Sequence, residues 1–219
     1  MPYNCHTSNR LKNCFKKKPW QGNDPTKARF IFVGLDANFD SNIENTLPVI
    51  FDYLDDGVCY WKNKRIHHPF CLNSYHGSGK LYHKRFAQIG FKPDEAELVS
   101  FVELLHLPTT GRSTLNLSDL SSNQSKEHLC KLANWFDCGS ARYIFLVGGK
   151  VTELMRQTGM FPCPWLPRNP VSEKNYPDLK VLYKKNGQTI YEIYHFSVHY
   201  KKQVIVLRRQ IAQIALLPR

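Results

Sequence analysis

Three short and almost entirely apolar runs constrain the fold of this chain most strongly. Residues 28–36 read ARFIFVGLD, residues 98–107 read LVSFVELLHL, and residues 143–147 read YIFLV. Such runs, rich in β-branched and aromatic side chains and followed by glycine or proline, are typical of parallel strands that are buried on both faces. The sequence therefore predicts a buried sheet.

Segments with the apolar spacing of helices separate these runs. They cover residues 41–53, 81–89, 122–136, 151–157 and 204–217. Asn186-Gly187 predicts a hairpin between residues 179–184 and 188–194, the second arm being the last strand of the sheet. Strands that alternate with helices through right-handed crossovers predict an α/β fold, a three-layer α/β/α sandwich with a central, mostly parallel sheet. The region at 57–79, with Gly57, Pro69, Gly77 and Gly79, is expected to be rich in loops, and the proline-rich residues 161–177 are expected to be a loop.

Charge indicates the class of partner. The 219 residues carry a net charge of +12, and a chain this basic tends to meet a polyanion, most often nucleic acid. A chain of 219 residues fits one domain, which we place at residues 28–219. Residues 1–27 are rich in lysine and arginine and show no sustained period, which predicts a basic N-terminal arm, packed on the domain or partly mobile.

Several classes of protein fit the sequence poorly. The chain has no apolar run of 18 residues that could span a membrane, and its polar, basic start is unlike a secretory signal, so we expect a cytoplasmic protein. The seven cysteines include no CxxC pair, and we expect them to be reduced and mostly buried. A metal held by Cys5, His6 and Cys14 is the alternative that the cysteine pattern leaves open.

Polar residues gather where the predicted strands end, at residues 34–39, 106–111, 148–150 and 195–200. Reactive groups in α/β sheets collect at these carboxyl ends. Asp36 can orient a water molecule for attack on a sugar carbon, or it can simply cap the next helix. His195 can donate a hydrogen bond to a leaving oxygen, or its ring can be satisfied by the backbone.

Four motifs in this order resemble the uracil-DNA glycosylase superfamily over about residues 28–217. GLDAN at 34–38 stands where the family has Gly-x-Asp/Asn-Pro, and HFS at 195–197 stands where it has His-Pro-Ser or Asn-Pro-Ser. LHLPT at 105–109 and LVGGK at 146–150 are similar to the mismatch-specific uracil/thymine branch. Both motif prolines are replaced, by Ala37 and Phe196.

The resemblance implies a role for each matching residue. Asp36 would activate water or stabilise the sugar cation, and His195 would bind the base oxygen as it leaves. Phe70 is the candidate for stacking on the flipped base, with Tyr75 second. The residues expected to contact DNA are Ser197, Lys201, Lys202 and Lys150, which would bind phosphates, and Val198, His199 and Tyr200, which would form a wedge.

The base-reading residues depart from the family pattern. Asn38 stands where uracil-specific members have a tyrosine that shields the pyrimidine C5 position. Its side chain is smaller and is expected to offer both a donor and an acceptor, so the pocket is expected to admit a 5-substituent. Otherwise Phe39 or Phe70 would close that space. In the family an asparagine reads the base, and no asparagine of this chain is matched to it. The nearest polar groups on that strand are Glu103 and His106, of which Glu103 could accept from a cytosine amino group.

The sequence thus predicts a monofunctional DNA glycosylase that acts as a monomer without metal or organic cofactor. Its substrate would be a uracil-like base or a 5-modified pyrimidine. A hypermodified cytosine of phage DNA, as in antiviral defence, is the alternative. A non-catalytic DNA-binding module is the rival from another class. A nucleotide hydrolase is disfavoured because Gly77-Ser-Gly-Lys80 lacks the remaining residues of a phosphate loop.

Overall fold

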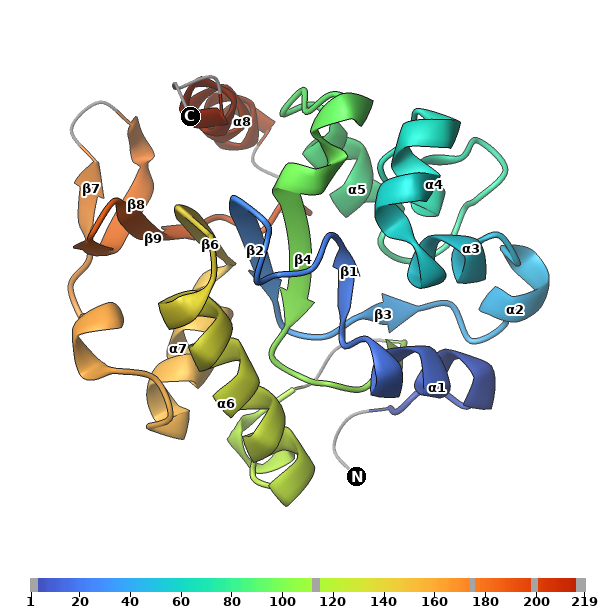
Figure 1. Ribbon diagram of the computed structural model, residues 1–219, viewed down its shortest axis with the longest axis horizontal. Coiled ribbons are helices and arrows are strands. Elements are labelled where there is room, and N and C mark those ends of the chain that lie inside the picture. Colours follow the sequence, from blue (N-terminus) through green and yellow to red (C-terminus); the bar gives the residue numbers. More distant parts are fainter. Residues whose placement is uncertain (1–3, 112–114, 174–175, 198–200, 216–219) are drawn as a thin grey trace.

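Strands and helices alternate along most of the chain (Figure 1). The structure, a computed structural model, describes residues 4–111, 115–173, 176–197 and 201–215. The strands are β1 (Trp20–Gly22), β2 (Phe30–Gly34), β3 (Asn38–Phe39), β4 (Val99–Glu103), β5 (Thr109–Thr110), β6 (Tyr143–Val147), β7 (Val171–Glu173), β8 (Tyr176–Lys185) and β9 (Gln188–Ile193). The α-helices are α1 (Asn9–Lys17), α2 (Ile43–Thr46), α3 (Ile50–Asp55), α4 (Gly57–Lys64), α5 (Lys80–Ala87), α6 (Asn123–Cys138), α7 (Gly149–Thr158) and α8 (Lys201–Ala215).

Four parallel strands, in the order β4-β2-β6-β9, make up the middle of a seven-stranded sheet. β1 pairs antiparallel with β4 at one edge, and β8 and β7 continue the other edge in antiparallel fashion. The chain passes from β2 to β4 on one side and then to β6 on the other, so the strand order reverses at β2. In open α/β sheets ligands bind at such a reversal, outside the carboxyl ends of the strands.

The sheet buries side chains on both faces. On one face Ile31 and Ile144 belong to a cluster with Leu132 of α6, and on the other face Phe32 belongs to a cluster with Phe86 of α5. Figure 1 shows α6 and α7 on one side of the sheet, with α5 and α8 on the other. Helices on both faces of a central, mostly parallel sheet confirm the predicted α/β class and are compatible with three layers.

Most predicted elements form, with bounds that differ by a few residues. α5, α6, α7 and α8 take the places of four predicted helices, and β8 and β9 form the predicted hairpin. Asn186 and Gly187 both have positive φ, at 50° and 81°, as a tight two-residue hairpin requires. No helix among the described residues is both long and apolar enough to cross a membrane.

Four expectations about elements differ from the structure. The helix expected at 41–53 is two helices, α2 and α3, because Pro48 lacks an N–H and disfavours helical backbone at the residue before it. The region 57–79 contains α4, and the region 161–177 contains β7. The basic arm contains α1, whose buried residues are only Leu11 and Phe15, and β1, whose three residues are too short for a visible period.

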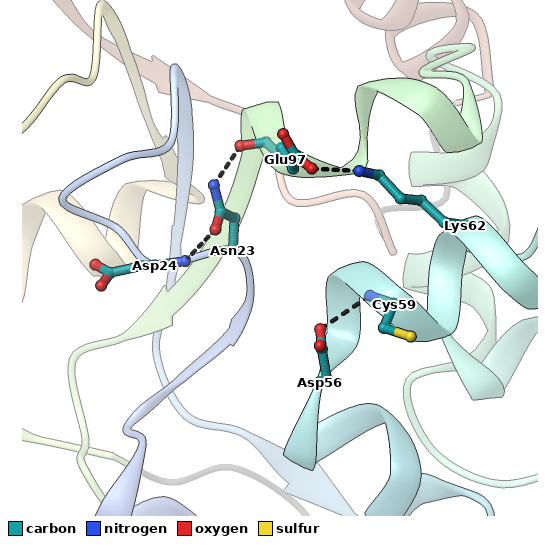
Figure 2. A network of polar contacts seen from close by, with 6 residues as sticks. All are labelled: Asn23, Asp24, Asp56, Cys59, Lys62 and Glu97. Carbon is teal, nitrogen blue, oxygen red and sulfur yellow. Dashed lines mark hydrogen bonds and ion pairs between the residues drawn. The ribbon is translucent and has the colours of Figure 1, made fainter.

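Polar contacts hold β1 and α4 against the turn that precedes β4 (Figure 2). Asn23, just after β1, donates from Nδ2 to the backbone carbonyl of Glu97, and Lys62 of α4 forms an ion pair with the Glu97 carboxylate. Asp56 accepts from the backbone nitrogen of Cys59 at 2.9 Å and caps α4. The exposed ion pair contributes little to stability. The end of β1 is fixed by the side-chain bond of Asn23 and by its backbone nitrogen, which donates to the carbonyl of Val99 at 2.9 Å.

Candidate active site

A cavity of about 260 Å³ lies where the carboxyl ends of β2 and β4 meet the residues after β9. A volume of this size is at the small end of ligand sites. The cavity brings together these predicted site residues: Asp36, Asn38, Phe39, Phe70, Glu103, His195 and Ser197. The reversal of strand order at β2 therefore places the first and last motifs around one space.

Thr109 of β5 holds the side chain of Asp36. Its hydroxyl donates to Oδ2 of Asp36 and accepts from Nδ2 of Asn38 at 3.1 Å. Only 2% of Thr109 is exposed, so the bond to the carboxylate is shielded from water. Asp36 does not cap α2, which has no side-chain cap and whose N-cap position is Asn42. Asp36 is thus a positioned carboxylate at the cavity wall.

Asn38 has less capacity to bind a base than its side chain suggests. Its Nδ2 donates to Thr109 Oγ1 and, at 2.8 Å, to the carbonyl of Gly111. Both amide hydrogens are therefore engaged within the protein. The expectation of both a donor and an acceptor was wrong in part, because only Oδ1 is left to face the cavity.

The N-terminal arm supports this wall. The backbone of Thr110 donates to the carbonyl of Asn4 at 2.9 Å, and that of His6 donates to the carbonyl of Pro108 at 2.9 Å. The ring of His6 bonds the carbonyl of Asp40 through Nε2 and accepts from the backbone of Ser8 through Nδ1. These bonds occupy both ring nitrogens. Among the described residues no three histidine, cysteine or carboxylate side chains are placed to hold one metal ion, so the alternative of a metal at Cys5, His6 and Cys14 gains no support.

His195 presents an N–H donor at the mouth of the cavity. Its Nδ1 accepts from the backbone nitrogen of Ser197 at 3.2 Å. Although His195 is exposed in part, its partial burial lowers the pKa of the ring, and the charge of Asp36 opposes this shift. A neutral ring that accepts at Nδ1 carries its proton on Nε2. Arg85 of α5 supports the same segment by donating to the carbonyl of Phe196 at 2.6 Å.

Glu103 reaches into the cavity over Gly34, its neighbour in the parallel register of β2 and β4. A Cβ on residue 34 would overlap the carboxyl group of Glu103, so the glycine makes room for this side chain. Burial raises the pKa of Glu103 well above its usual range, and the negative charge of Asp36 raises it further. A neutral carboxylic acid offers one donor and one acceptor. The two carboxyl groups of the site thus differ in environment.

Phe70 forms an aromatic wall whose orientation is fixed. Its ring is 3% exposed and stacks on Tyr75, with centroids 4.5 Å apart and planes at 11°. On the cavity lining Gly79, with φ of 80°, approaches so closely that a Cβ there would lie 2.7 Å from the Phe70 ring. Phe39 meets the ring edge at 5.7 Å between centroids. Tyr75 is absent from the described lining and supports Phe70 from behind.

Several predicted residues are not part of the cavity. His106 lies beside His128 of α6, with ring centroids 5.9 Å apart, and Lys150 is exposed and pairs with Glu153 at 3.5 Å. His199 and Tyr200, with Val198, lie outside the described residues. Lys201 and Lys202 begin α8, where the side chains also lie outside the described part.

The structure also bears on the expectations for the cysteines and for the segment that resembles a phosphate loop. The cysteines are free, as predicted, but none is fully buried, and those at positions 59, 130, 138 and 163 are exposed. Lys80 of the segment that resembles a phosphate loop donates to the backbone carbonyls of Tyr75 and Asn73. Its ammonium group therefore ties down the loop between Phe70 and α5.

Sequence reasoning missed Gln21, Tyr82 and His83, which also line the cavity. Gln21 comes from β1 in the N-terminal arm, and its place depends on pairing with β4, which no local pattern reports. His83 is buried in a histidine cluster and bonds His67 at 3.1 Å between Nδ1 and Nε2. The adjacent pair His67-His68 was the one visible signal of that cluster.

Comparison with known proteins does not assign this site. No protein-family model matches the sequence, and no curated protein matches it. The function has to be argued from the cavity, the charge of the chain and the order of its motifs.

Proposed function

We propose that this chain is a monofunctional DNA glycosylase with a fold like that of the uracil-DNA glycosylases. The observation that carries the proposal is the meeting of Asp36 and His195 in one cavity beside a fixed aromatic ring, Phe70. The order of the motifs and the net charge of +12 support it. A glycosylase needs this combination because it must hold an extruded base and stabilise charge on both sides of the bond that breaks.

Each residue has one task in the proposed reaction. The flipped base stacks on Phe70, and the carboxylate of Asp36 orients a water molecule towards C1′ of the sugar and stabilises its developing positive charge. The C–O bond forms as the glycosidic C–N bond breaks, and the bonding electron pair leaves with the base. Nε2–H of His195 donates to the base oxygen on which negative charge develops. The proton released by water neutralises the base, which leaves a free base and an abasic site.

DNA would approach over the open side of the cavity. Ser197 lines its mouth, Lys150 is exposed at the start of α7, and Lys201 and Lys202 begin α8 close in sequence to His195. We propose these groups as phosphate contacts and residues 198–200 as the wedge that replaces the flipped base. The volume of about 260 Å³ favours a single base over a larger ligand, and we propose that this base is uracil-like or a 5-modified pyrimidine, including a modified cytosine.

The direct test is incubation with duplexes that differ in one base, followed by alkaline cleavage at abasic sites. The panel holds uracil, thymine mismatched with guanine, cytosine, 5-hydroxymethyluracil, 5-hydroxymethylcytosine and glucosylated 5-hydroxymethylcytosine. We expect alkali-dependent breakage at the variable base in at least one duplex. Tight binding without breakage in the whole panel would favour the rival, a DNA-binding module without catalysis.

The contact between Thr109 and Asp36 yields a prediction of its own. Thr109→Val keeps the shape of the side chain but removes the hydroxyl that donates to Asp36. A hydrogen bond to a charged group contributes about 1.5–3 kcal/mol, so single-turnover cleavage should slow by roughly 10- to 100-fold. Binding to DNA should change little. Thr110→Val, one residue along β5 and outside the described cavity lining, is the matched control, and equal rates for both variants would contradict this role of Thr109.

A further inference from the structure

Gln21 places an amide group in the cavity from a strand that none of the motifs includes. The residue lies opposite Phe101 in the antiparallel pair of β1 and β4, and it is 6% exposed. The bond between Asn23 and the Glu97 carbonyl, drawn in Figure 2, fixes the end of this short strand. Its side chain therefore occupies a set place on the cavity wall.

His68 determines which way the Gln21 amide faces. Nδ1 of His68 accepts from the backbone nitrogen of Phe70 at 3.1 Å, and Nε2 lies 3.1 Å from Oε1 of Gln21. Burial holds the pKa of His68 well below its ordinary value, so the ring is neutral. A neutral ring that accepts at Nδ1 must donate at Nε2, and its partner must be the oxygen of the amide. The Nε2 amino group of Gln21 is then left for the cavity.

The neighbouring rings prevent His68 from turning. It is fully buried and stacks on His83, with centroids 3.7 Å apart and planes at 12°. Tyr53 packs against it with a centroid distance of 4.5 Å. Reversing the Gln21 amide would set N–H against N–H at His68. Among the described residues, Nε2 of Gln21 has no hydrogen-bond partner, so the cavity holds an oriented and unused donor.

We propose that Gln21 is a specificity-determining residue that donates a hydrogen bond to an oxygen of the flipped pyrimidine and so excludes unmodified cytosine. The proposal rests on the glycosylase function and names the substrate class, a pyrimidine with an acceptor oxygen at this wall. That oxygen is O4 of a uracil-type base or the oxygen of a 5-hydroxymethyl group. If the oxygen is O4, the amino group of cytosine would meet the amide N–H of Gln21 and leave two buried donors unpaired. If it is the hydroxymethyl oxygen, unmodified cytosine leaves the Gln21 donor without a partner.

The size of the effect follows from that loss. A buried polar group left without its partner lowers affinity by roughly 10- to 100-fold. Exclusion of cytosine matters because it is a normal base, present at every G·C pair that the enzyme meets. Phe70 cannot supply this discrimination, since stacking is tolerant of base identity.

The test uses binding, so it does not depend on cleavage. Duplexes carry a 2′-fluoroarabino nucleotide, which resists hydrolysis, with uracil, cytosine or 5-hydroxymethylcytosine as its base. We expect wild-type protein to bind the uracil or the 5-hydroxymethylcytosine duplex at least 10-fold more tightly than the cytosine duplex. Which of the two is preferred identifies the oxygen. If uracil is preferred, Gln21→Glu presents an acceptor in place of the donor and should bring the affinity for cytosine up to or above that for uracil. If 5-hydroxymethylcytosine is preferred, its hydroxyl can donate to the new acceptor, and Gln21→Leu is the variant that should bring its affinity close to that for cytosine.

Two variants and one control separate reading of the base from loss of structure. Gln21→Leu should weaken binding of the preferred base without improving cytosine. His68→Leu frees the amide to turn and should narrow the ratio between the two affinities, which a general loss of stability would not do. Gln88→Glu makes the same chemical change at an exposed position outside the described cavity lining and should leave the ratio unchanged.

The outcomes distinguish this inference from the proposed function. An unchanged affinity ratio in Gln21→Leu, or a wild-type protein that binds all three bases equally, would overturn the role of Gln21 even if the enzyme cleaves DNA. If the protein shows the expected ratio of affinities but cleaves none of the natural duplexes, Gln21 is supported as a base reader and only the proposed catalysis is contradicted.

Discussion

Asp36→Asn is expected to lower the single-turnover cleavage rate by at least ~100-fold, which corresponds to about 2.7 kcal/mol of transition-state stabilisation. The amide oxygen can still accept from Thr109, so the side chain keeps its place. What it loses is the negative charge that orients water and stabilises the sugar cation. DNA binding should be nearly unchanged, because the group acts on the reacting atoms.

Asp40→Asn is the matched control for this change of charge. Asp40 directly follows β3, whereas Asp36 follows β2. Asp40 is absent from the described cavity lining, and its Oδ1 accepts from the backbone of Asn42 at 2.9 Å. We expect it to cleave at nearly the wild-type rate. If Asp36→Asn also stayed within a few-fold of wild type, Asp36 would be a structural residue and the proposed mechanism would be wrong.

Acid should destabilise the folded protein strongly through the histidine cluster beside the cavity. Burial lowers the pKa of His67 to about 3, and it lowers the pKa of His68 and His83 well below the usual value. The folded state keeps these rings neutral, whereas the unfolded chain takes up protons below pH ~6.5. Stability is therefore present above the unfolded pKa and is lost as the pH falls. Between pH 7.5 and pH 5 each histidine should remove about 2 kcal/mol.

The pKa shift of Glu103 changes stability with pH in the opposite sense to the shifts of the three histidines. Its folded pKa is raised, so its buried carboxyl favours the folded state at low pH and this contribution is lost as the pH rises. In the wild-type protein it offsets part of the loss from the three histidines. In Glu103→Gln that offset is removed, and the loss of about 6 kcal/mol from these three histidines should appear. His128, whose pKa burial lowers to about 4, adds to this loss in the wild-type protein and in the variant alike.

Chemical unfolding at the two pH values, followed by circular dichroism, measures this effect. We expect a clear fall in the free energy of unfolding for the wild-type protein and a larger fall for Glu103→Gln. His76→Gln, which removes an exposed histidine, should follow the wild-type curve. Equal free energies at both pH values in Glu103→Gln would show that the cluster is protonated or open to water in the folded state.

The sequence predicts the sheet well because a buried parallel strand leaves a strong local signal. β2 and β6 fall within the apolar runs, and their carboxyl ends identify the edge where Asp36 lies. His195 follows the last parallel strand for the same reason. The meeting of these two side chains then depends only on the general rule that parallel strands share their carboxyl edge.

The rest of the site depends on tertiary contacts that leave no local pattern. Gln21 reaches the cavity through a three-residue edge strand, and its orientation is set by His68, which is far away in the sequence. Thr109 is brought to Asp36 by the pairing of β3 with β5. This pairing covers only two residues, which is too short to leave a visible period in the sequence. Asn38 was interpreted from a motif position alone, which cannot show that its amide hydrogens bind Thr109 and Gly111.

Recovery of the free base is the measurement that tests the glycosylase proposal most directly. Enzyme in excess is incubated with the duplex that is cleaved best, and the released base and the DNA strand are both quantified by mass. We predict one intact free base for each abasic site, a strand that stays continuous until alkali is added, and no release with Asp36→Asn. A strand broken before alkali treatment, or no free base from any duplex in the panel, would contradict the account.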